Sequence, residues 1–98
     1  MVFSFDADLW LHDGAAPWHF VTVPSVIADE IEATVRGARR GFGAVKVSVT
    51  IGSTTWATSL FPDTKAASYV LAVKRMVRER EGLAAGDTVS VSMVVVDR

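Results

Sequence analysis

Residues 45–60 read VKVSVTIGSTTWATSL, and this stretch determines the fold. From Val45 to Ile51, apolar residues occupy every second position, which is the period of a half-buried strand. Gly52-Ser53 then suits a two-residue turn that needs glycine at its first central position. The turn predicts a hairpin in which Val49 lies opposite Trp56. The same register pairs Ile51 with Thr54, Thr50 with Thr55, Val47 with Thr58, Lys46 with Ser59 and Val45 with Leu60.

The rest of the chain predicts further strands and two short helices. Pro24-Ser25 ends one strand and supplies an N-cap, Gly37 closes the first helix, and Gly82 with Leu83 has the form of a glycine C-cap. Gly41-Phe42-Gly43 indicates a bulge or bend before the hairpin. The remaining strands are expected over residues 3–11, 18–23, 69–71 and 89–95, and the helices over 26–36 and 73–81.

This order of elements predicts one domain that covers residues 1–98. The fold class is mainly β with two short helices, arranged as a small closed or partly open antiparallel β-barrel. The first helix is expected to cap an open end of the barrel. Closure also removes exposed strand edges, which otherwise pair with other chains. The alternative is an α+β sandwich with both helices on one face of a sheet.

Composition excludes several classes of protein. Half of the 98 residues are hydrophobic and 21% are charged, which indicates a folded domain. The net charge of -1 gives no overall attraction to nucleic acid. The absence of cysteine excludes disulfides and thiolate chemistry. We expect a cytoplasmic protein with no membrane partner, because the chain has no long apolar run and its start does not resemble a signal peptide.

Several short motifs are spread along the chain: Trp18-His19-Phe20-Val21 leading to Pro24, Gly41-Phe42-Gly43, Thr54-Thr55-Trp56, Thr58 to Pro62, Lys74, Gly82-Leu83 and Gly86-Asp87. Together they resemble the DUF1905 family, a bacterial domain of unknown function. The resemblance spans nearly the whole chain, and the central hairpin is its most specific part. It implies a small capped β-barrel, but the family has no established activity. Ala57 and Ala72 depart from the family pattern, which more often has a basic residue and a proline there.

One tryptophan and a set of basic residues are the candidate binding residues. Trp10 falls on the polar face of the first strand, so it is expected on the barrel exterior, exposed unless another element covers it. Trp56 falls on the valine face and is expected in the core. The basic residues could form a single positive patch suited to phosphates. The weak candidates for ligand or partner binding are Trp10, Arg39, Arg40, Lys46, Lys74 and Arg75, with Lys65, Arg78 and Arg80 as further members of the patch.

Other polar residues give no catalytic or metal-binding pattern. His12 and His19 lack a recognisable ligand spacing and are interpreted as surface or loop residues. Asp6 and Asp8 share an outer strand face, which is interpreted as solvated. No catalytic residue, metal site or cofactor is therefore assigned.

The sequence leaves three function classes open. The first is a small non-catalytic binding or interaction module, monomeric or homodimeric, whose partner is a protein or a small ligand. The second is a binder of single-stranded nucleic acid or a phosphate ligand through the basic patch. The third is an enzyme or ligand-sequestering pocket inside the barrel. The first is preferred, because the isoelectric point near 6.0 is low for a nucleic-acid domain.

Overall fold

The computed structural model describes residues 2–14, 16–35 and 43–96. Its order of strands and helices is the one that the sequence predicts. The elements are β1 (Val2–Leu11), β2 (His19–Thr22), α1 (Ser25–Val35), β3 (Val45–Ile51), β4 (Thr54–Asp63), β5 (Ser68–Ala72), α2 (Arg75–Glu81) and β6 (Thr88–Val95).

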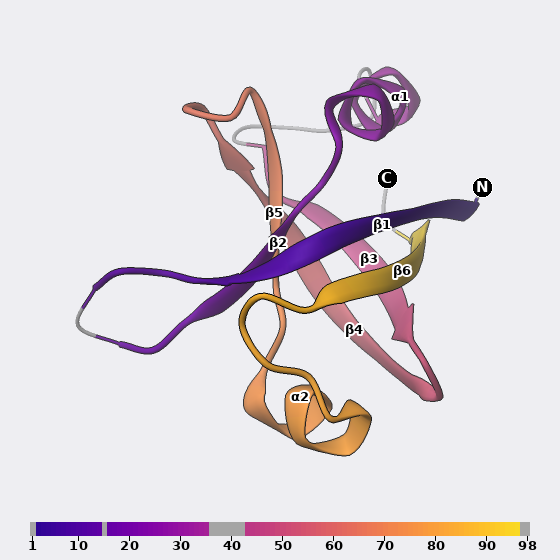
Figure 1. The fold of residues 1–98 in the computed structure, drawn as a ribbon. Helices are drawn as coiled ribbons and strands as arrows, with labels where there is room; N and C mark the ends of the chain where they lie inside the picture. The colour runs from indigo at the N-terminus through magenta and orange to yellow at the C-terminus, as the bar shows by residue number, and fades with distance from the viewer. Residues whose placement is uncertain (1, 15, 36–42, 97–98) are drawn as a thin grey trace.

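The six strands close into an antiparallel barrel (Figure 1). Around the ring the order is β1, β2, β5, β4, β3 and β6. Strand β5 therefore lies between β2 and β4, and β6 returns to close the ring between β3 and β1. The barrel confirms the expected fold class, and the alternative α+β sandwich is wrong.

The central hairpin has the register that its sequence predicts. Val49 pairs with Trp56, and all the other expected pairs are present from Val45–Leu60 to Ile51–Thr54. Gly52 has a φ of 60°, a conformation that glycine adopts without steric cost. On the outer face, the hydroxyls of Thr50 and Thr55 are 2.8 Å apart and share a hydrogen bond. The alternation and the position of the turn together determine this register, because a slip of one residue would expose the whole valine row.

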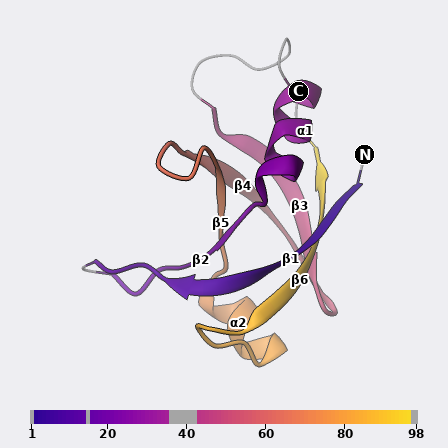
Figure 2. The ribbon, with the colours of Figure 1, turned by 45° about the horizontal axis from the view of Figure 1, so that its top comes forward.

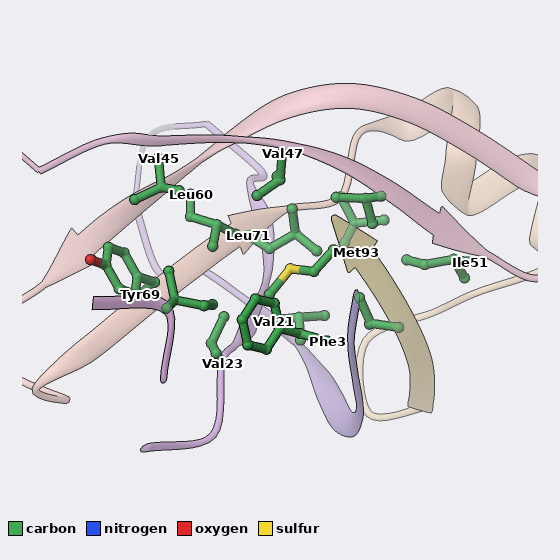
Figure 3. Close-up of a cluster of buried hydrophobic side chains, with 14 of the residues drawn as sticks. Phe3, Val21, Val23, Val45, Val47, Ile51, Leu60, Tyr69, Leu71 and Met93 are labelled. Atoms are coloured by element: carbon green, nitrogen blue, oxygen red, sulfur yellow. The ribbon is translucent and has the colours of Figure 1, made fainter. Parts of the chain in front are cut away.

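Both helices close the ends of the barrel. Helix α1 lies at one end and α2 at the other (Figures 1 and 2). Ile31 of α1 and Val77 of α2 are fully buried, and they belong to the same hydrophobic cluster as the strand residues. Between them, side chains from several strands point toward one another, such as Leu71 and Met93 (Figure 3). The expected cap by the first helix is confirmed. The second helix covers the opposite end of the barrel, which the sequence did not indicate.

The second helix is shorter than expected. Val73 is buried, but its backbone N–H donates to the carbonyl of His19 at 2.9 Å. This bond continues the strand, so the helix begins only at Arg75. Met76, in the first turn of this helix, is 43% exposed. The expected helix end at Gly37 and most of the expected bend at residues 41–43 lie outside the described residues.

The last residue of α2 accepts hydrogen bonds from the β3–β4 turn. Glu81 Oε2 accepts hydrogen bonds from the Thr54 hydroxyl at 2.6 Å, the Ser53 hydroxyl at 3.2 Å and the Ser53 backbone N–H at 3.3 Å. These donors stabilise the ionised carboxylate, and the Thr54 hydroxyl has the largest effect in lowering the pKa of Glu81. The bonds join α2 to the β3–β4 turn, 27 and 28 residues away in sequence.

Glu81→Gln is expected to destabilise the fold more at neutral pH than at acidic pH. The folded-state pKa of Glu81 is lowered, so its ionised form contributes stability above the ordinary value near 4.5. That contribution is lost as the pH falls through the folded-state value. Urea denaturation of both proteins from pH 7 to pH 3 should show the difference in unfolding free energy shrinking. Thr54→Ser keeps the hydroxyl donor and should retain the wild-type pH dependence. If the difference in unfolding free energy between the wild type and Glu81→Gln did not change with pH, the stabilising role of the ionised Glu81 would be contradicted.

Candidate binding surface

Half of the barrel exterior is apolar. The register places Trp10 of β1, Phe20 of β2 and Ala72 of β5 side by side in one outward-facing row. In the next row, Val70 of β5 lies beside Phe61 of β4. The opposite half carries serine, threonine and aspartate, in rows such as Ser4, Ser92, Thr50 and Thr55. We call the apolar half the aromatic face, defined by His12, Trp18, Phe20, Phe61, Val70 and Ala72, which line a hollow of about 370 Å³.

The rings of the aromatic face are organised around Phe20. Trp10 packs on Phe20 with ring centroids 5.2 Å apart, and His12 meets it edge-on at 6.0 Å. Trp18 lies nearly parallel to Phe20, with an interplanar angle of 9° and centroids 6.1 Å apart. The β1–β2 hairpin extends past the barrel wall (Figures 1 and 2). His12 and Trp18 belong to the connection between these two strands, next to the strand ends. Trp18 is 55% exposed and Phe61 is 51% exposed, so both offer open surface to a ligand.

Trp10 supports this face instead of forming its open surface. It lies on the outer side of β1, as expected, but it is only partly exposed. Phe20 and His12 cover its ring, and its indole N–H donates to the Thr22 hydroxyl at 3.0 Å. Sequence reasoning therefore missed Trp18 as the exposed tryptophan. The sequence did not show that Trp10 pairs with Phe20. This pairing places Phe20 on the outer face of the barrel beside Trp10.

Basic residues form one rim of the aromatic face. A second hollow of about 300 Å³ lies between the β1–β2 loop and the start of α2, and Trp18 lines this hollow as well. Lys74, Arg75 and Arg78 line it too, and we call these three residues the basic rim. Arg75 Nε contacts Glu79 Oε2 at 2.8 Å, and Arg78 Nε donates to the carbonyl of Val73 at 3.1 Å. Among the described residues, no aspartate or glutamate lines either hollow.

The structure brings together only part of the expected basic patch. Lys74, Arg75 and Arg78 lie together, whereas Lys65 belongs to the β4–β5 connection at the α1 end of the barrel. The expectation of a single patch that includes Lys65 is therefore wrong. Lys46 is exposed on β3 opposite Ser59, which places it diagonally beside Phe61 at the other side of the aromatic face. Arg39 and Arg40 lie outside the described residues, and Arg80 is exposed on α2.

Asp6, Asp8 and His19, three other polar residues considered in the sequence analysis, have partners within the protein. Asp6 and Asp8 accept hydrogen bonds from the Ser90 and Thr88 hydroxyls at 2.7 and 3.0 Å on the polar half of the barrel. His19 Nδ1 lies 3.0 Å from the Pro17 carbonyl. Across the described ranges, no group of three or more histidine, aspartate or glutamate residues could hold a metal ion.

The interior of the barrel offers little polar chemistry. Thr54 is the only buried polar or charged residue in the part of the chain that the structure describes, and its hydroxyl is bonded to Glu81. The other buried side chains are hydrophobic and packed in one cluster, in which the Tyr69 hydroxyl donates to Glu32 Oε1 at 2.7 Å. A ligand that needs converging polar groups therefore finds more of them outside the barrel wall than inside it.

The fold and this surface together define a closed six-stranded β-barrel with a helix at each end and an aromatic groove on its outer wall. The model of DUF1905, a domain of unknown function, matches residues 5–93, and the chain belongs to this family. No curated protein matches the chain. Within the described residues, no helix has the length and apolar character needed to cross a membrane.

Proposed function

We propose that this protein is a small non-catalytic binding module that uses the aromatic face and the basic rim as one site. The observation that carries the proposal is the exposed Trp18 ring, which lines two hollows whose described lining residues include no carboxylate. Contiguous apolar surface of this kind on a small domain often marks a place of interaction. Its cysteine-free composition supports a cytoplasmic location for the module.

The two hollows suggest what kind of ligand fits. A planar or apolar group can lie against Trp18 and Phe20, because rings of this kind provide large contact areas and defined geometry. An anionic group can lie beside Lys74, which has no carboxylate partner among the described residues. A ligand that carries both a planar or apolar group and an anionic group would make favourable contacts in both hollows. An interior catalytic pocket has less support, because the interior of the described barrel is almost entirely apolar.

A nuclear magnetic resonance titration tests the proposed site. The probe is 2-naphthyl phosphate, and 2-naphthol and inorganic phosphate are the controls for its two parts. Backbone amide shifts should cluster at His12, Trp18, Phe20, Ala72 and Lys74, and 2-naphthyl phosphate should bind more tightly than either control. Shifts that cluster at the α1 end of the barrel, or no saturable shifts at all, would contradict the proposal.

Trp18→Ala is expected to weaken binding of 2-naphthyl phosphate by about threefold to tenfold, since an aromatic pair contributes roughly 0.5–1.5 kcal/mol beyond area burial. The same substitution should cost about 1 kcal/mol of stability or less, because the side chain is largely solvent-exposed. Val26→Ala is the matched control, since Val26 is 68% exposed on α1 at the other end of the barrel. Equal affinity of the Trp18 variant and the wild type would remove this residue from the site.

A further inference from the structure

We propose that the ligand of this site is single-stranded nucleic acid, with bases against the aromatic face and phosphates beside the basic rim. This inference rests on the proposed function and names the ligand class for the same site. It depends on three features of the described residues: the arrangement of the rings, the distribution of charge around them, and the hydrogen bonds that already occupy the arginines.

The arrangement of the rings suits successive bases. Trp18 lines both hollows, so one base can enter the hollow toward Phe61 and the next base the hollow toward α2. The nearly parallel Trp18 and Phe20 rings provide flat surfaces on the outside of the wall. Every base has a flat π-face, so stacking of this kind binds single strands with little sequence preference. A duplex keeps its bases stacked on one another and cannot offer these faces.

Basic side chains lie at two sides of the face, although the whole protein is slightly acidic, Glu79 pairs with Arg75 and Asp13 follows His12 in the chain. Lys74 and Arg78 lie at one side of the aromatic face, and the register places Lys46 at the other side, next to Phe61. Acidic residues such as Asp6 and Asp8 lie on the polar half of the barrel. A chain that crosses the aromatic face would therefore meet a cation at each side. This arrangement complements a phosphate backbone, even with a net charge of -1.

Two of the three side chains of the basic rim already take part in hydrogen bonds within the protein. Arg75 Nε is engaged by Glu79, and Arg78 Nε is engaged by the carbonyl of Val73. Their terminal Nη groups remain able to donate to a phosphate or to a carboxylate. Lys74 remains as a point charge with three donors, which suits a phosphate oxygen approached from several directions.

Fluorescence anisotropy with end-labelled 12-nucleotide oligo(dT) and oligo(U) tests the inference. Trp18→Ala should weaken binding by about fivefold to 150-fold, because a stacked base contributes roughly 1–3 kcal/mol. Trp18→Phe should retain most of the affinity. Lys74→Ala should make the dependence of log K on log salt shallower by about 0.7, the value for one lost phosphate contact on a single strand. Lys65→Ala is the charge-matched control and should change neither quantity.

Four outcomes would contradict the inference. If the protein binds 2-naphthyl phosphate at this face but binds neither oligonucleotide, the ligand class is wrong and the proposed site stands. If a 12-residue peptide of alternating glutamate and tryptophan binds and the oligonucleotides do not, the ligand is an acidic peptide. If oligonucleotides bind but Trp18→Ala and Lys74→Ala have no effect, the nucleic-acid site lies elsewhere on the protein. Equal affinity for a 12-base-pair duplex would contradict the stacking argument.

Discussion

Trp56→Ala is expected to lower the free energy of unfolding by about 3–5 kcal/mol, the usual cost of removing a large aromatic side chain from a core. Trp56 is 9% exposed and belongs to the hydrophobic cluster inside the barrel. It pairs with Val49 at the centre of the β3–β4 hairpin. The cost therefore includes both lost burial and a residual cavity.

Urea denaturation followed by far-ultraviolet circular dichroism measures this effect without relying on the tryptophan signal. Trp18→Ala provides the matched control, because it removes the same side chain from the exterior of the barrel. The two variants should differ by at least about 2 kcal/mol, given a cost of about 1 kcal/mol or less at an exposed site. If Trp56→Ala left the free energy of unfolding nearly unchanged, Trp56 would have to be reassigned as a contact residue on an accessible surface.

The hairpin was predictable from sequence because its strand pattern and its turn lie within one short stretch of the chain. The alternation from Val45 to Ile51 defines the inner face, and Gly52 defines where the chain turns. Together they give the pairing of every residue between Val45 and Leu60, and the structure confirms all of it. Family resemblance then supported the barrel, whose closure no local pattern could establish.

The binding surface was less predictable because it depends on how distant strands meet. β5 lies between β2 and β4, and only this order brings Ala72 and Lys74 next to Trp18 and Phe61. No spacing in the sequence encodes that neighbourhood. Trp10 was assigned to the correct face, but its exposure depended on Phe20, whose orientation was unknown until the strands were paired.

Ile31→Ala is expected to lower the free energy of unfolding by about 2–5 kcal/mol. Ile31 is fully buried on α1 and packs in the same cluster as the barrel strands, so its removal leaves a cavity where the helix closes the barrel end. Val26→Ala on the exposed side of the same helix should change stability by less than about 0.5 kcal/mol. Urea denaturation with tryptophan fluorescence and circular dichroism measures both variants.

The two signals should change together in the Ile31 variant, because a helix that closes the core unfolds with the barrel as one unit. A loss below about 1 kcal/mol, or a helix transition separate from the barrel transition, would show that α1 is a loosely attached lid. The distinction bears directly on function. A lid could open and admit a ligand to the barrel interior, whereas a plug that is part of the core keeps that end closed. A large cost at Ile31 would thus favour the exterior aromatic face as the place where a ligand binds.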